Sequence, residues 1–419
     1  MTTTDTTRPE APTPAPPRPV AHAKPALSLP EFVALMAMLS ATIAFSIDAM
    51  LPALPEIGRE LAPDAPNSAQ LVIVAFVFGM GLGTLFTGPL SDAIGRKRVM
   101  VGGAALYCVA AALCTIAPSL ETILAARVLQ GLGASGPRVV AMAMIRDLYA
   151  GRGMARVSSF VMMTFTLVPA IAPLMGAFII EGFGWRGVFW AFVLFAALSG
   201  TWLTVRQPET LPPERRRPMD LGRMRAAVVE VFGHANVRRA IAVQTLVFGL
   251  LFGTITSVQQ IYAVTFDRAA AFPWWFGLVA LLAGSASFLN ARLVGRLGML
   301  WLLRRALATH LLLSLVLAGA WALPFVPEAA HFPMFLVWQI GSFALAGLTI
   351  GNLNAIAMQP MGHIAGMASS VISATATILA VVVAAPIGLA FDGTPLPLML
   401  GAALCGGVAL WLARGLVEG

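Results

Sequence analysis

Charged side chains are scarce in this sequence of 419 residues, because only 11% are Asp, Glu, Lys or Arg, against about 25% in ordinary soluble domains. So few charges cannot build a water-soluble surface, which excludes a soluble enzyme and a DNA-binding protein. Cysteine is scarce too. The three cysteines, Cys108, Cys114 and Cys405, lie inside apolar runs and form no C-x-x-C pair. They exclude a disulfide scaffold and are typical of small core residues.

Motifs for catalysis are also missing. The apolar stretches contain no H-E-x-x-H, no G-x-S-x-G and no paired acids, and the chain has no phosphate-binding loop. We therefore expect a protein that is not an enzyme and that holds no cofactor and no metal. Without an ATP-binding domain, any work that it performs must draw on an ion gradient.

Apolar side chains dominate what is present, at 58% of the residues. One membrane span needs about 20 apolar residues, and twelve continuous apolar stretches of that order follow Pro30. Continuous runs favour helices over a barrel, whose strands would alternate. The sequence therefore predicts an all-α polytopic membrane protein with twelve transmembrane helices in two pseudo-symmetric six-helix halves. The expected spans are about 31–53, 69–90, 99–117, 121–144, 156–180, 186–205, 239–263, 273–292, 304–323, 334–357, 367–391 and 397–413.

The basic residues predict the orientation of these spans. With the amino terminus inside, 22 of the 27 basic residues fall in cytoplasmic segments, and only Arg59, Arg186 and Arg268 fall in outside loops. This bias places both termini in the cytoplasm of a bacterial inner membrane. The net charge of +8 then reflects topology and anionic lipid headgroups, so that membrane lipids and no nucleic acid are the expected partners.

Four segments follow from this reading. Residues 1–29 hold seven prolines and no apolar core, so we expect a disordered cytoplasmic tail. Residues 30–205 form the amino-terminal six-helix half, 206–238 a cytoplasmic linker, and 239–414 the carboxyl-terminal half. Paired halves around a central site are typical of secondary transporters.

Several short motifs carry a family resemblance. The loop after span two, G-P-L-S-D-A-I-G-R-K-R, resembles the G-x-L-x-D-R-x-G-R-[KR] signature of the major facilitator superfamily, with Ala93 where the usual Arg stands. The resemblance extends over about 30–414, and two of its motifs are similar to the bicyclomycin-resistance (Bcr/CflA) drug-efflux branch. The further matching runs are R-V-L-Q-G-L-G at 127–133, P-A-I-A-P-L-M-G at 169–176, D-A-M-L-P-A-L-P-E-I at 48–57 and M-G-H-I-A-G-M-A-S-S at 361–370.

The resemblance implies a cytoplasmic gate in the loop after span two. In the family the acid matching Asp92 clamps the halves shut against the amino end of span eleven, which Gly366 marks here. A helix dipole favours an anion at that position. The alternative is a plain positive-inside loop with one compensating acid. The gate motif comprises Gly88, Asp92, Gly95, Arg96 and Lys97.

Span five resembles the family's antiporter motif. Pro169 and Pro173 remove backbone hydrogen bonds and bend the helix, and Gly176 allows close approach of a neighbour. A bent helix suits alternating access, although prolines are common in membrane spans generally.

Asp48 is the one acid that falls clearly inside a span. An ionisable group there costs about 2.5–3.5 kcal/mol and is a functional candidate. Arg127 in span four lies at a similar depth, so we expect an Asp48–Arg127 pair that acts as a proton switch. The resemblance ties both matching residues to proton coupling. The alternative is a static buried pair that fixes helix register.

The substrate cavity is expected to suit neutral or other non-cationic amphipathic molecules. Cation-exporting relatives carry a second acid two turns before the span-one Asp, where this chain has Ser40. Arg138 follows Arg127 by three turns and either lines the cavity or snorkels to the cytoplasm. The expected cavity residues are Ser40, Gln130, Arg138, Gln244 and Asn354.

These features predict a monomeric, proton-coupled exporter of small molecules, most consistent with multidrug efflux by antiport. Two alternatives stay open: a nutrient importer of the same fold for riboflavin or copper, and a membrane sensor that does not transport. Copper is the weaker importer hypothesis, because span seven contains no Met and span eight no His. Only His363-x-x-x-Met367 has the required spacing.

Overall fold

The computed structural model describes residues 26–324 and 326–418, without the side chains of residues 165 and 166. The predicted tail 1–29 therefore lies, apart from its last four residues, outside the described residues. The described backbone is mostly helical and contains no strand. Its α-helices are α1 (Leu29–Asp48), α2 (Leu54–Leu61), α3 (Leu71–Ile94), α4 (Arg96–Thr115), α5 (Leu120–Leu148), α6 (Gly151–Arg206), α7 (Leu221–Gly233), α8 (Ala235–Gln260), α9 (Phe272–Leu297), α10 (Met299–Trp321), α11 (Glu328–Met358), α12 (Ala365–Leu389) and α13 (Leu396–Arg414).

The helices confirm the expected fold class. In the described residues ten helical segments are long and apolar enough to cross a membrane. Two of these segments contain two crossings each. Residues Gly151–Arg206 turn back at Gly184, whose φ of 66° interrupts α6, and residues Glu328–Leu389 join α11 to α12 through a short turn. The segments thus supply the twelve crossings that the apolar runs predict.

The outer surface of the bundle is apolar. On the second arm of α6, Trp190, Leu194 and Leu198 recur every four residues and expose 57%, 71% and 59% of their surface. Residues at this spacing share one face of a helix. A large exposed apolar face belongs in lipid, so the chain is a multi-pass membrane protein.

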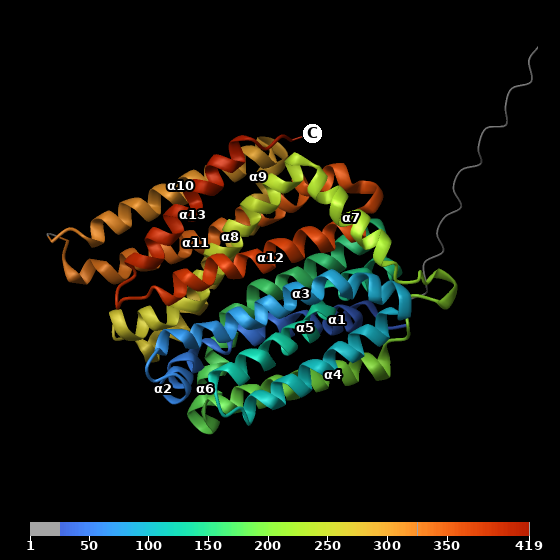
Figure 1. The fold of residues 1–419 in the computed structure, drawn as a ribbon, viewed down its shortest axis with the longest axis horizontal. Helices are drawn as coiled ribbons and strands as arrows, with labels where there is room; N and C mark the ends of the chain where they lie inside the picture. Colours follow the sequence, from blue (N-terminus) through green and yellow to red (C-terminus); the bar gives the residue numbers. More distant parts are fainter. Residues whose placement is uncertain (1–25, 325, 419) are drawn as a thin grey trace, which may run out of the picture.

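The twelve crossings divide into two halves, α1–α6 and α8–α13, which lie side by side (Figure 1). The described ends of the chain and the linker lie on one side of the bundle, which we call the terminal side. The loops after α1 and α10 lie on the opposite side, the far side. The linker contains a helix that the sequence analysis did not predict, α7, which Asp220 caps by accepting a hydrogen bond from the Arg223 amide at 3.1 Å.

Close packing of α3 on α5 determines which way α5 turns its side chains. A Cβ on Gly79 would overlap the carbonyl oxygen of Val128, and a Cβ on Gly131 would overlap that of Phe76. Only glycine allows backbones this close. The face of α5 that carries Arg127 is therefore pressed against α3.

Candidate functional site

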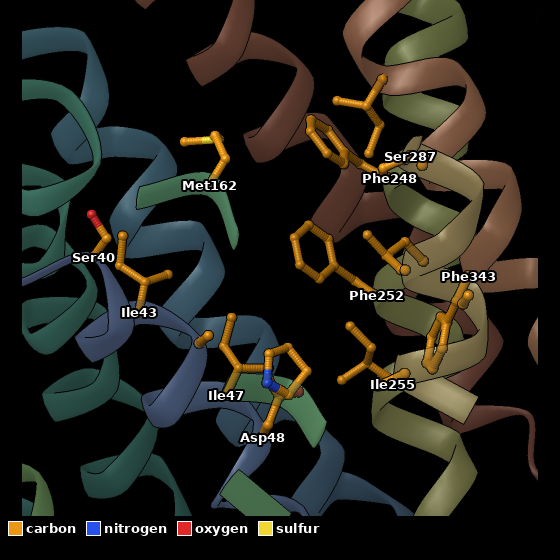
Figure 2. Close-up of a pocket in the computed structure, with 18 of the residues that line it drawn as sticks. Ser40, Ile43, Ile47, Asp48, Met162, Phe248, Phe252, Ile255, Ser287 and Phe343 are labelled. Carbon is orange, nitrogen blue, oxygen red and sulfur yellow. The ribbon is translucent and has the colours of Figure 1, made fainter. Parts of the chain in front are cut away.

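A cavity of about 540 Å³ lies between the two halves, near the middle of the bundle (Figure 2). Helices α1, α3, α5 and α6 line it from one half, and α8, α9 and α11 line it from the other. Its lining is almost entirely apolar. The polar side chains in it are Ser40, Asp48, Arg138 and Ser287.

The carboxyl-terminal half supplies an aromatic wall. Figure 2 shows Phe248 and Phe252 projecting from α8 toward Ile43 and Ile47 on α1. Their rings stack with centroids 5.9 Å apart. Two further phenylalanines, Phe276 and Phe343, meet edge to face at 5.6 Å and also line the cavity. Such a wall binds apolar and aromatic bodies without demanding one shape.

Asp48 is the last residue of α1, and its side chain faces this cavity at 4% exposure. After α1 ends, the chain forms a short 3-10 turn, Leu51–Ala53, which contains Pro52. Within the described residues the carboxylate receives no hydrogen bond and forms no ion pair. A buried carboxylate without a partner is costly when ionised, so the cavity holds a group poised to take up a proton or a positively charged partner.

Arg127 occupies a different place from the one expected. Its guanidinium is fully buried and donates to the carbonyl oxygens of Val72 at 3.0 Å and Ser46 at 3.0 Å, and to Gln130 Oε1 at 2.8 Å. It also stacks over the Phe76 ring, 4.4 Å from the centroid. The expected direct pair with Asp48 is therefore not formed.

The reason is helix rotation. The sequence indicates that Asp48 and Arg127 lie at a similar depth, but it does not fix the direction in which each side chain points. The glycine contacts between α3 and α5 turn Arg127 toward backbone carbonyls. Arg127 still reaches Asp48's helix, because Ser46 lies two residues before Asp48. The Ser46 hydroxyl hydrogen-bonds the Tyr107 hydroxyl as well, so this turn of α1 is fixed by α4 and α5 together. The sequence analysis missed Tyr107, for which a lone hydroxyl in an apolar span is the available signal.

Arg138 lines the cavity, which decides between the two positions left open for it. Its Nη2 donates to Thr377 Oγ1 of α12 at 3.3 Å. In the described residues no carboxylate forms an ion pair with it.

Of the other expected cavity residues, one lines the cavity and three do not. Ser40 lines the cavity. Gln130 is bound to Arg127, and Gln244 donates to Asn354 Oδ1 at 3.0 Å between α8 and α11. These three amides lie outside the cavity lining. Gln244 and Asn354 join α8 to α11, whereas Gln130 binds Arg127 within α5, because a buried amide in a membrane span is stabilised by the first partner that packing offers.

The span-five motif contacts both the cavity and α1's end. Pro169 lines the cavity, and Pro173 lies one turn farther within the same arm of α6. A Cβ on Gly176 would overlap the carbonyl oxygen of Ala49, the residue after Asp48. The three motif residues thus place α6 directly against the segment that carries the buried acid.

On the terminal side Asp92 and Gly88 lie near the start of α12, but the clamp that the resemblance implies is not formed in the part of the chain that the structure describes. Asp92 forms an ion pair with Arg96 at 2.6 Å. It shares a crevice of about 230 Å³ with Gly366 at the start of α12. No hydrogen bond joins Asp92 to Gly366 in the described residues. Gly88 packs against Ser370 of α12, whose Oγ lies 3.2 Å from where a Cβ would stand.

Glu209, which the sequence analysis did not single out, completes this loop. Its carboxylate accepts hydrogen bonds from the amides of Arg96 at 2.9 Å and Lys97 at 3.2 Å, which open α4. An anion at a helix start is stabilised by the helix dipole. Gly95 has a φ of 108°, and a Cβ there would overlap the Glu209 carboxylate. The signal in the sequence was an isolated acid just after span six.

The far side is closed by hydrogen bonds that cross between the halves. We call Asn67, Gln70, Ser257 and Gln260 the far-side latch. Gln70 donates to Gln260 Oε1 at 2.8 Å, and Gln260 donates to Asn67 Oδ1 at 2.6 Å. Ser257 donates to Gln70 Oε1 at 3.3 Å. The latch lies just beyond Ile255, which lines the cavity, so it joins the two halves next to the cavity's far end.

Two amides of the latch also bind backbone at the end of α12. Asn67 donates to the carbonyl oxygens of Leu389 at 3.2 Å and Phe391 at 2.9 Å. Gln70 donates to that of Gly388 at 3.1 Å. Every group in these contacts is uncharged. The two sides therefore differ: amides lock the far side, whereas charged groups border an open crevice on the terminal side.

Comparison with known proteins adds sequence evidence. A model described as the Major Facilitator Superfamily matches residues 33–385. An "Uncharacterized MFS-type transporter YdgK" of Bacillus subtilis is 29% identical over 367 residues, covering 85% of this chain and 88% of that protein. A "Bicyclomycin resistance protein homolog" of Haemophilus influenzae is 29% identical over 347 residues, 81% and 84% of the two chains. "Multidrug resistance protein MdtL" of Escherichia coli O9:H4 is 39% identical over 150 residues, 35% and 38% of the chains.

Solved structures agree on the fold. A crystal structure of a D-xylose-proton symporter superposes with a TM-score of 0.75 at 14% identity, covering 93% of this chain and 98% of that one. The human organic anion transporter MFSD10 gives 0.67 at 18% identity over 92% and 100% of the chains. At such identities the likeness concerns the arrangement of the helices alone.

Proposed function

The chain belongs to the Major Facilitator Superfamily, and from this premise we propose that it is a proton-coupled exporter of small amphipathic molecules that are not net cations. Transporters of this superfamily act on small molecules, and the chain is a transporter and no enzyme. The finer proposal, proton-driven efflux of several compounds by antiport, draws on the printed names of the relatives, which include bicyclomycin resistance and multidrug resistance.

One observation carries the proposal. Asp48 is buried, faces the cavity and has no partner in the described residues. A carboxylate of this kind is stable when it binds a proton or a positively charged group of a substrate, and it is costly to leave ionised with neither bound. Exchange of one for the other at a single acid couples the two fluxes. A proton that moves down a membrane potential of 100 mV contributes about 2.3 kcal/mol.

Arg127 has an indirect part in this scheme. It binds the Ser46 carbonyl on α1 and carbonyls of α3, so it holds the helix that presents Asp48. We propose that proton coupling resides in Asp48 and that Arg127 positions it.

The orientation follows from the basic residues. We propose that the terminal side faces the cytoplasm of a bacterial inner membrane, with both termini there, and that the protein works as a monomer. The hydrogen-bonded far-side latch and the absence of a bond between Asp92 and α12 in the described residues support a conformation whose cavity opens toward the cytoplasm. Release to the outside then requires the latch to part and Asp92 to engage α12.

The test uses the full-length protein in sealed vesicles with an imposed pH gradient. With chloramphenicol and ethidium as probes, wild type is expected to accumulate the neutral probe against its gradient and to accumulate the cation poorly. Asp48→Asn should abolish uphill movement while leaving insertion and thermal unfolding unchanged. Uphill transport by Asp48→Asn would refute the coupling assignment. Movement of substrate with the proton flux, rather than against it, would refute export in favour of uptake.

A further inference from the structure

Two arginines on α5 have opposite environments, which identifies the one that faces a ligand. Arg127 is sealed in protein, with three hydrogen bonds and an aromatic ring over its face. Arg138 lies on the cavity, and the described residues use one of its donors, in a 3.3 Å bond. A guanidinium has five N–H donors in a planar fork that matches a carboxylate.

Thr377 positions Arg138 at the edge of the cavity by accepting its hydrogen bond. Its hydroxyl donates to the Ser373 carbonyl at 2.7 Å, so its lone pairs are turned toward Arg138. The side chain is 1% exposed, and it joins α12 of one half to α5 of the other. Arg138 is therefore held by the opposite half while its other donors stay available to a ligand.

The negative end of the same cavity is Asp48. Ser40 is the twelfth residue of α1, and Arg138 lies ten residues before the end of α5, so both lie at a similar depth from the terminal side. Asp48 is eight residues beyond Ser40, which is about 12 Å along the helix axis at 1.5 Å per residue. Between the two charges the lining is apolar, and the aromatic wall of α8, α9 and α11 faces it.

We propose that this cavity recognises zwitterionic or strongly dipolar aromatic molecules, with the acidic group at Arg138 and the basic group at Asp48. A net-neutral molecule of this kind satisfies both charges that the protein leaves unpartnered. A lone cation leaves Arg138 unpaired, and a lone anion leaves Asp48 unpaired, and each unpaired buried charge is costly. The inference rests on the proposed function and names its substrate class. The ammonium and the proton then compete for the same carboxylate, which is the requirement for exchange.

The experiment measures equilibrium binding to the purified full-length protein in detergent, without any gradient. The probe is a radiolabelled biphenyl with an aminomethyl group at one para position and a carboxylate at the opposite one. Two analogues each remove one charge: the carboxamide lacks the anion, and the N-acetyl compound lacks the cation. Wild type is expected to bind the zwitterion roughly tenfold or more tightly than either analogue, as charge-assisted hydrogen bonds imply.

Variants assign each charge to its residue. Arg138→Gln should bind the zwitterion and the carboxamide equally while still rejecting the N-acetyl compound. Asp48→Asn should show the reverse pattern. Arg138→Lys keeps the charge and should retain part of the preference for the carboxylate, which separates charge recognition from a folding defect. Arg292→Gln is the matched control, because Arg292 is exposed and stacks on Phe288 outside the cavity.

Three results would overturn the assignment: a wild type that binds an analogue as tightly as the zwitterion, a wild type that binds none of the three compounds, or an Arg138→Gln protein that keeps its full preference for the carboxylate. The proposed function fails separately. A protein that binds the zwitterion selectively but never moves it against a pH gradient retains this site and loses proton coupling. A protein that pumps chloramphenicol but ignores these charges retains transport and loses the zwitterion site.

Discussion

Gln70 and Gln260 are 190 positions apart in the sequence, yet Gln70 Nε2 lies 2.8 Å from Gln260 Oε1. This contact joins the two halves of the molecule at the far end of the central cavity. Since both groups are uncharged amides, the junction does not depend on pH. Opening of the far side therefore breaks hydrogen bonds of modest strength rather than ion pairs.

Weakening the far-side latch should expose the cavity from the far side. We expect the double variant Asn67→Ala, Gln260→Ala to raise labelling of a cysteine at position 255 roughly thirtyfold or more, because four hydrogen bonds worth about 0.5–1.5 kcal/mol each are lost. The measurement uses a membrane-impermeant maleimide added from that side, in a background with Cys108, Cys114 and Cys405 replaced by alanine.

Asn236→Ala is the matched control for the latch. Asn236 also makes two amide hydrogen bonds, both 3.0 Å long, with Val417 on the terminal side. Its loss should leave far-side labelling unchanged. Equal labelling in the control and the latch variant would mean that general loosening, and not the latch, controls access.

Arg127 and Arg138 should differ sharply in their effect on stability. Arg127→Met removes the donor from two carbonyls and one amide in a buried site, which we expect to cost about 3 kcal/mol or more. Arg138→Gln should change the free energy of unfolding by about 1 kcal/mol or less, since Arg138 lies on a cavity with one long hydrogen bond. Thermal unfolding of the purified proteins in detergent compares them. Similar losses in both variants would contradict the division between a positioning arginine and a ligand-binding arginine.

Gly176 should be intolerant of even one added carbon. Gly176→Ala forces a methyl group into the Ala49 carbonyl, and overpacking of this kind costs about 1–3 kcal/mol. Because Ala49 follows Asp48, we also expect slower transport. Gly182→Ala lies in the same arm of α6 and meets nothing within 4 Å, so its stability should hold or rise. Unfolding temperature and vesicle uptake are measured on both, and a harmless Gly176→Ala would show that α6 can move away from α1 freely.

The sequence predicted the fold because the length of each apolar stretch can be read directly from the order of the residues. Both doubled segments, 151–206 and 328–389, separate at the turns that the apolar runs imply. The helix α7 was missed, since 13 residues of mixed polarity carry no membrane signal. Ser40, Asp48 and Arg138 line the cavity, as expected for polar or ionisable groups inside a span, which face protein interior; for Arg138 the sequence left a position at the cytoplasmic surface equally open.

Partner choice could not be predicted in the same way. The pair of Asp48 with Arg127 was inferred from depth, and depth does not fix rotation about a helix axis. Rotation is decided by the contacts of Gly79 and Gly131, which bring α3 and α5 together. Glu209 was missed for a related reason, because its role depends on where the chain after α6 folds back onto α4.

Among the described residues that line the cavity, both ionisable ones, Asp48 and Arg138, belong to the first half of the chain, whereas the four phenylalanines belong to the second. Natural variation can therefore reshape what is carried by altering the aromatic surface, while the energetics of carriage stay with the other half. Substrate selectivity and energy coupling can therefore evolve separately within one polypeptide.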